Sequence, residues 1–285
     1  MRFLSFLSNG QKGLAAVDAD GQLRGVLANE AAYPGDLETL IANDGLAAAY
    51  EAIVASGAAI SIDDVEVLPV LSNPPKIFCL GINYKDHAAE AGIELPDYPT
   101  IFSRYSTSLI GHNTPIIRPK ISDQLDYEGE LVVVVGKGGR HISEGDALDH
   151  VAGYSVFNDG TLRDYQLKTT QWNVGKTFDG TGSFGPYLVT PEELPKGAAG
   201  LSIETRLNGT VVQKSNTDQL IFDAAKVISL MSEAMTLEAG DVFVMGTPSG
   251  VGHFHQPPLY MKPGDICEVE IEKIGLLSNG IADEA

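Results

Sequence analysis

Basic side chains are scarce in this sequence of 285 residues, and this scarcity argues against one large class of partner. The 19 lysines and arginines stand against 38 aspartates and glutamates, which gives a formal net charge of −19. Proteins that bind nucleic acid need a positively charged surface that neutralises phosphates. We therefore expect no nucleic-acid partner. The acidic excess names no other partner, because a high net charge also serves solubility.

Cysteines and long apolar runs are scarce as well. Cys79 and Cys267 lie far apart, have no CxxC neighbours, and occupy apolar or alternating segments, so both are predicted to be buried thiols. No apolar run reaches the length of a membrane-spanning helix. The first 13 residues lack the apolar stretch and cleavage site of a signal peptide. We therefore expect a cytoplasmic protein with no membrane partner.

The N-terminal quarter of the sequence predicts a small separate domain. Asn9-Gly10 and Asp20-Gly21 are hairpin turn signals, and they separate three predicted strands, Arg2–Leu7, Gly13–Val17 and Leu23–Leu27. A helical segment follows over residues 36–56, with a break near residues 43–45. The proline-rich stretch Val67–Pro75 is interpreted as a linker. We expect a small α+β domain at residues 1–70 and a larger catalytic domain at residues 71–285.

The larger part predicts a β-rich α+β fold. Its predicted strands are Ile77–Leu80, Leu131–Val135, Val151–Phe157, Val242–Met245 and Ile266–Ile271. The run Leu131–Val135 is apolar throughout, which is typical of a strand buried on both faces. Two helices are predicted, Asn83–Ala91 with Asn83 as its N-cap, and the amphipathic segment Asp218–Met235.

Three carboxylates lie beside these predicted strands. Glu128 and Glu130 enter the strand at Leu131 and should point to the same face, roughly 7 Å apart. Carboxylates so close repel each other unless a cation lies between them. Asp159 ends the next strand. Three carboxylates without a nearby Cys or His favour a hard cation such as Mg²⁺ or Mn²⁺. The alternative is a solvated acidic strand start, which the valine-rich strand makes less attractive.

Two further groups of polar residues could carry chemistry. His87 and Glu90 are three residues apart on a predicted helix and share a face, so the carboxylate could orient the imidazole as a general base for water. Seen in isolation, this spacing favours a surface pair over a catalytic one. Arg163, Gln166 and Lys176 could clamp a carboxylate or stabilise an oxyanion, and the alternative is that they are solvated loop residues.

The roles of Thr247, His253 and His255 remain open. The loop Gly246–Gly250 could offer backbone N–H groups and the Thr247 hydroxyl to an anion, although a plain turn is equally consistent. His253 and His255 suggest zinc, but no Cys or third His stands at ligand spacing, so both are left unassigned. Trp172 is predicted to be a packing residue.

Taken together, these segments resemble the fumarylacetoacetate hydrolase superfamily, and in particular its bacterial branch of acylpyruvases, fumarylpyruvate hydrolases and 2,4-diketo-3-deoxy sugar acid hydrolases. The resemblance covers most of residues 75–280, whereas residues 1–70 match less well. The similar segments follow one another in the family's order: IFCLGINYKDHAAEAGIELP, IFSRYSTSLIGHNTPIIRP, LDYEGELVVVVG, FNDGTLRDYQ, VGKTFDGTGSFGPYLVT, VMGTPSGVG and MKPGDICEVEIEKIGLLSN. This order makes the resemblance more specific than any single motif.

The resemblance implies a mixed β-roll, usually assembled as a homodimer, and assigns roles to the site residues. It implies that the Mg²⁺ or Mn²⁺ ligands are Glu128, Glu130 and Asp159. The implied catalytic residues are His87, Glu90 and Lys176, with the His–Glu dyad on a lid segment. The implied substrate-binding residues are Arg163, Gln166, Thr247, Arg104 and Tyr84. Ile82 and Arg104 depart from common family residues, which leaves the substrate open.

The function implied is metal-dependent C–C bond hydrolysis. A 2,4-diketo acid of the acylpyruvate type would be cleaved to release pyruvate through an enolate that the metal stabilises. One alternative is decarboxylation or isomerisation of a 2-oxo dicarboxylic acid such as oxaloacetate, or dehydration of a keto-deoxy sugar acid. A second alternative, of a different class, is a metal-dependent binding protein without activity.

Overall fold

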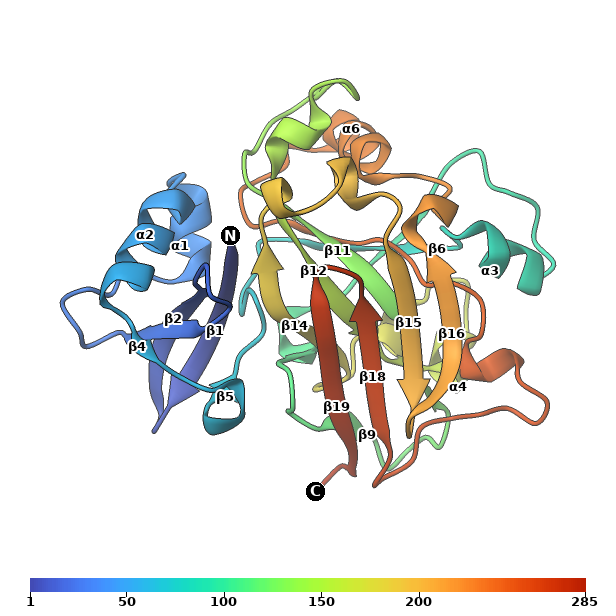
Figure 1. Cartoon of the computed structure of the whole chain (residues 1–285). Coiled ribbons are helices and arrows are strands. Elements are labelled where there is room, and N and C mark those ends of the chain that lie inside the picture. Colours follow the sequence, from blue (N-terminus) through green and yellow to red (C-terminus); the bar gives the residue numbers. More distant parts are fainter.

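A computed structural model describes residues 1–285 and shows a β-rich protein built on one large sheet (Figure 1). The strands of this sheet are, in chain order, β1 (Arg2–Ser8), β2 (Gln11–Val17), β3 (Leu23–Leu27), β4 (Ala58–Ala59), β5 (Glu66–Val67), β6 (Ile77–Gly81), β7 (Thr100–Ser103), β8 (Leu109–Ile110), β11 (Gly129–Val135), β12 (Val151–Asp159), β14 (Gly182–Val189) and β17 (Val242–Val244). Their spatial order is β4-β3-β2-β1-β14-β12-β11-β17-β6-β7, with β5 paired to β1 and β8 to β14.

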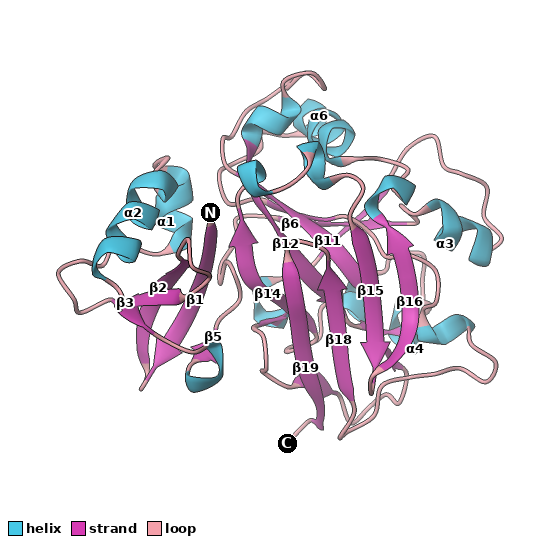
Figure 2. Cartoon of the chain, viewed as in Figure 1, coloured by secondary structure: helices cyan, strands magenta, loops and turns pink.

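A second sheet of five strands packs across the first. Its order is β16-β15-β18-β19-β9, and its strands are β9 (Ile116–Arg118), β15 (Ser202–Leu207), β16 (Thr210–Asn216), β18 (Ile266–Ile271) and β19 (Gly275–Asp283). Figure 2 shows this sheet in front of β11 and β12, with the helices at the periphery. A short pair, β10 (Leu125–Asp126) and β13 (Thr161–Leu162), completes the strands. The expected β-rich α+β fold class is confirmed.

The N-terminal segment forms the predicted hairpins and helices. The helical stretch divides into α1 (Leu37–Ala42) and α2 (Leu46–Ser56), and Asp36 caps α1 by accepting the N–H of Thr39 at 2.9 Å. β1 pairs antiparallel with β14, so the large sheet runs from this segment into the main body. The domain boundary at residue 70 stays a prediction.

Strand β11 is buried on both faces, as the apolar run predicted. Leu131, Val133 and Val135 belong to a core shared with the five-stranded sheet and with helix α6 (Ala224–Ala234). Val132 and Val134 point the other way, into a core shared with α1 and α2. Because both faces are packed, the start of this strand is held rigidly, and that is where the predicted carboxylates lie.

Two predicted helix starts were wrong. Helix α6 begins at Ala224 and not at Asp218, because Asp223 caps it by accepting the N–H of Lys226 at 2.9 Å. Helix α3 (Lys85–Glu90) has no side-chain N-cap. The Asn83 side chain instead bonds three backbone groups elsewhere: it accepts from the N–H of Phe222 and donates to the carbonyls of Phe222 and Met245. No helix is both long enough and apolar enough to cross a membrane.

Candidate active site

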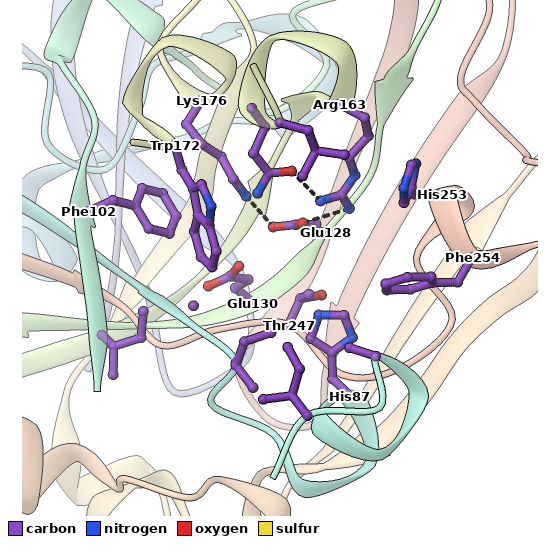
Figure 3. A pocket seen from close by; sticks show the side chains of 17 residues that line it. His87, Phe102, Glu128, Glu130, Arg163, Trp172, Lys176, Thr247, His253 and Phe254 are labelled. Carbon is purple, nitrogen blue, oxygen red and sulfur yellow. Dashed lines mark hydrogen bonds and ion pairs between the residues drawn. The ribbon is translucent and has the colours of Figure 1, made fainter. Parts of the chain in front are cut away.

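A cavity of about 260 Å³ lies where β11 begins and α3 covers it (Figure 3). Most of the residues singled out from the sequence line it, together with an apolar wall. The lining residues are Leu80, Gly81, Ile82, His87, Ala91, Ile93, Phe102, Glu128, Glu130, Arg163, Gln166, Leu167, Trp172, Lys176, Thr247, His253 and Phe254.

The three predicted carboxylates meet at this cavity. Glu130 pairs across the ladder with Phe157, so Asp159, two residues further along β12, faces the same side as Glu130. Glu128, two residues before Glu130, shares that side. One ligand oxygen from each of Glu128, Glu130 and Asp159 lies within 4.8 Å of the others, and all three residues are buried.

Two buried cations hold part of this cluster. The Lys176 amine, carried by α5 (Asn173–Lys176), donates to Glu128 Oε2 at 2.5 Å and to Asp159 Oδ2 at 2.6 Å. Arg163, at the start of α4 (Arg163–Gln166), places Nη2 2.7 Å from Glu128 Oε1. Figure 3 shows Glu128 between the two cations. Arg163 also donates from Nη1 to Gln166 Oε1 at 2.9 Å, which places that amide beside the cluster.

Glu130 is the member of the cluster without a cationic partner. Its Oε2 accepts the backbone N–H of Gly246 at 2.5 Å. Burial raises the pKa of Glu130 well above its ordinary value, and the neighbouring Asp159 and Glu128 raise it further. Burial would also raise the pKa of Glu128, but Lys176 and Arg163 outweigh it and lower that pKa. The set of oxygens around Glu130 therefore fits a hard divalent cation, which would relieve the like-charge repulsion.

The predicted His–Glu dyad covers the cluster. Nδ1 of His87 lies 3.0 Å from Glu90 Oε2, which leaves Nε2 as the ring nitrogen free of this contact. Glu90 Oε1 accepts the N–H of Gly250 at 2.8 Å, so helix α3 is tied to the loop that follows β17. The same helix is held by Asp86, which accepts the Ser215 hydroxyl at 2.7 Å. The imidazole therefore faces the carboxylate cluster across the cavity in a fixed orientation (Figure 3).

Asp126, to which the sequence analysis gave no role, connects two sides of the site. It is fully buried, and its Oδ2 accepts Arg163 Nε at 2.8 Å and the N–H of His253 at 2.9 Å. Its Oδ1 accepts the N–H of Gly252 at 2.8 Å. A Cβ at Gly252 would lie 1.9 Å from the Leu259 carbonyl oxygen, so only glycine fits there. Alternation of Asp126 with Glu128 and Glu130 could have signalled that all three share a face.

An aromatic wall closes the opposite side. Phe102 and Trp172 meet edge to face with ring centroids 5.8 Å apart. A Cβ at Gly81 would lie 2.1 Å from Trp172 Cζ3, so the indole packs directly on this glycine. Trp172 is thus a packing residue, as predicted, and also a wall of the cavity. Ile82, which also lines the cavity, has φ of 54°, a left-handed conformation that β-branched residues rarely adopt.

The structure places two predicted substrate contacts outside the cavity. Arg104 lies behind Asp159, where it bonds that carboxylate, the Gly160 carbonyl and the Thr181 hydroxyl. It therefore positions Asp159 and does not line the cavity. Tyr84, directly before α3, is fully buried within the core shared with the five-stranded sheet. Thr247 does line the cavity, while its hydroxyl donates to the Gly129 carbonyl at 3.0 Å.

The fold and this cavity of buried carboxylates are consistent with what comparison with known proteins finds. Residues 76–282 match the fumarylacetoacetate (FAA) hydrolase C-terminal family. The chain belongs to the fumarylacetoacetate hydrolase superfamily. It is 42% identical over 224 residues to the mitochondrial oxaloacetate tautomerase of Xenopus laevis, covering 78% of this chain and 70% of that protein.

Solved structures of other family members share the whole fold. Fumarylacetoacetate hydrolase from the psychrophilic Exiguobacterium antarcticum is 32% identical, with a TM-score of 0.85 and full coverage of both chains. Maleylpyruvate hydrolase from Sphingobium sp. SYK-6, in complex with manganese(II) ion and pyruvate, is 25% identical, with a TM-score of 0.82 and full coverage of both chains. A divalent metal is therefore found in this family.

Proposed function

We propose that this protein is a divalent-metal enzyme that interconverts the keto and enol forms of a small 2-oxo dicarboxylic acid, with oxaloacetate as the substrate. The observation that carries the proposal is the His87–Glu90 dyad facing the buried carboxylates Glu128, Glu130 and Asp159 across one cavity. The 42% identity to an oxaloacetate tautomerase supports the choice of substrate.

The size of the cavity supports a small substrate. Its volume of about 260 Å³ lies below the roughly 300–1,000 Å³ of pockets that hold drug-sized ligands. Phe102 and Trp172 form an aromatic wall on one side of the cavity. A four-carbon acid suits this space.

The carboxylate cluster would hold Mg²⁺ or Mn²⁺ through Glu128, Glu130 and Asp159. A cation bound there supplies Lewis acidity that makes the C3 protons of a 2-oxo acid easier to remove. His87, oriented by Glu90, would accept a proton from C3 and return one to the C2 oxygen. Lys176 and the Gln166 amide lie beside the cluster and would stabilise negative charge that develops on that oxygen.

Hydrolysis of an acylpyruvate-type 2,4-diketo acid is the second candidate. The same dyad favours it, because an imidazole held at Nδ1 by a carboxylate can accept a proton from water. Lys176 and Gln166 would then stabilise the oxyanion formed when water attacks the 4-keto carbon. The two candidates differ in whether a C–C bond breaks, and they can be separated by their products.

The test compares the two reactions in one preparation loaded with Mg²⁺ or Mn²⁺. Keto–enol interconversion of oxaloacetate is followed by the ultraviolet absorbance of the enol, and acylpyruvate cleavage by release of pyruvate. Acceleration of interconversion well above the rate of metal ion and buffer alone supports the proposal. Cleavage without interconversion would replace it with the second candidate. Glu130→Gln is the matched control, since it removes one carboxylate with little change in size.

A further inference from the structure

His253 lines the cavity, and its backbone is hydrogen-bonded by the Asp126 carboxylate, which also binds Arg163. Oδ2 of Asp126 accepts both Arg163 Nε and the backbone N–H of His253, so the distance between these two cavity residues is set by one buried atom. Gly252, which admits no side chain, tightens the turn just before it. Figure 3 shows the His253 ring on the side of the cavity opposite Trp172 and Phe102.

The hydrogen bonds of His253 leave one ring nitrogen available. Nδ1 lies 2.9 Å from the Tyr260 hydroxyl, while Nε2 has no hydrogen-bond partner in the chain. Burial lowers the pKa of His253, and Arg163 lowers it further, so the ring is neutral near pH 7. The Tyr260 hydroxyl also lies 3.5 Å from Gln124 Oε1, so its shorter contact is the one with Nδ1 of His253. When the hydroxyl donates to Nδ1, the neutral ring carries its proton on Nε2 and offers that N–H as a donor.

Several other polar groups of the cavity already have partners within the protein. Lys176 and Arg163 are paired with carboxylates of the cluster. The Thr247 hydroxyl accepts from Gln213 and donates to the Gly129 carbonyl. A second carboxylate on a bound acid cannot lie against the Phe102–Trp172 wall without losing its hydration. His253 lies on the side of the cavity opposite that wall (Figure 3), and its Nε2 has no partner in the chain.

We infer that His253, positioned by Tyr260, binds the distal carboxylate of the substrate and makes the site select 2-oxo dicarboxylic acids over monocarboxylic acids of equal length. This inference rests on the proposed function and deepens it by assigning the specificity to a residue. Asp126 is the positioning residue that keeps His253 and Arg163 at a fixed separation.

The test measures binding of two stable, unreactive probes, so it does not depend on turnover. Malate and 2-hydroxybutyrate both carry a C1 carboxylate and a C2 hydroxyl, but only malate has the distal carboxylate. Their dissociation constants are measured by calorimetry on the Mg²⁺-loaded protein, for the wild type and for His253→Phe, His253→Gln and Tyr260→Phe. Phenylalanine keeps the ring size without a donor, and glutamine restores an N–H at a similar reach.

The wild type should prefer malate. His253→Phe should weaken malate binding about tenfold, the usual worth of a hydrogen bond to a charged group, and leave 2-hydroxybutyrate unchanged. His253→Gln should recover most of the preference, and Tyr260→Phe should lose a smaller part of it. Equal weakening of both probes, or an unchanged preference in His253→Phe, would overturn the inference while leaving the proposed function intact. If neither probe binds the wild type, the proposed function fails and the inference with it.

Discussion

Oε2 of Glu90 lies 3.0 Å from Nδ1 of His87, and the second oxygen of the same carboxylate is occupied by a backbone N–H. With both oxygens engaged, the carboxylate cannot rotate without breaking a bond to the loop at Gly250. The tautomer of His87 is therefore set by Glu90, and Nε2 is the nitrogen available to exchange a proton with a bound substrate.

Replacing His87 should separate reactions that need a base from one that does not. We expect His87→Ala to lose tautomerisation or acylpyruvate hydrolysis by roughly 10²–10⁴-fold, the usual contribution of general acid–base catalysis. Any decarboxylation of oxaloacetate should persist, because it needs only the chelated cation, whereas Glu130→Ala should lose every activity. Initial rates of the three reactions, measured on oxaloacetate and on an acylpyruvate, test this. Wild-type rates of tautomerisation and hydrolysis in His87→Ala would show that the dyad is structural.

Glu130 should destabilise the metal-free protein. It is buried beside two other carboxylates and has no cationic partner. In EDTA at pH 7 to 8, Glu130→Gln should raise Tm by roughly 2–4 °C, which corresponds to about 1 kcal/mol in a chain of this size. Added Mg²⁺ should raise the Tm of the wild type but not that of the variant. Glu51→Gln, at an exposed position on α2, is the control and should change neither value.

Gly81 should tolerate no side chain while Trp172 stands over it. A methyl group there would lie 2.1 Å from the indole, so Gly81→Ala should cost about 1–3 kcal/mol of stability, as overpacking usually does. It should also weaken substrate binding, since the displaced indole forms the cavity wall. The double variant Gly81→Ala with Trp172→Leu should recover most of the stability. Chemical denaturation measures both. A fully stable Gly81→Ala would mean that the indole moves freely.

A homodimer remains a prediction, and the surface gives it some support. Four large apolar side chains are more than half exposed, namely Tyr105, Ile121, Leu167 and Val174. Ile121 and Val174 line the same hollow of the surface. Their burial in a dimer would be favourable. Light scattering at micromolar concentration should give twice the mass of one 30.3 kDa chain. A mass of one chain would contradict the prediction, and Leu167→Glu offers a variant that should shift the equilibrium toward monomer.

The carboxylate cluster could be predicted from the sequence because two of its members are close together in the chain. Alternation of Glu128 and Glu130 before an apolar strand determines that they share a face, whatever the rest of the chain does. His87 and Glu90 were similarly one helical turn apart. The contacts that the sequence did not reveal join distant segments. Asp126 meets the loop at His253 across 127 positions.

Tyr84 and Arg104 show a second limit of prediction from the sequence, which concerns the direction of side chains. Both were expected to bind the substrate because the family resemblance implied it. Their side chains turn away because other partners compete for them: Arg104 is bound by Asp159 and Thr181, and Tyr84 packs in the core. The same competition displaced the predicted N-cap, since the Asn83 amide is used to join the segments at Phe222 and Met245. Local propensity cannot foresee such tertiary bonds.

The pairing of β1 with β14 has a consequence for any attempt to study the catalytic part alone. Arg2 and Phe3 cover the backbone of Leu188 and Val189, and Phe3 shares a core with Val132 and Phe157 of the central strands. A chain that started at residue 71 would leave the backbone N–H and C=O groups of this stretch of β14 unpaired. The apolar side chains beside it would be exposed to solvent. Such edges recruit strands from other molecules. The shortened protein should therefore aggregate before it could be assayed. The first seventy residues keep the larger part soluble by covering this edge.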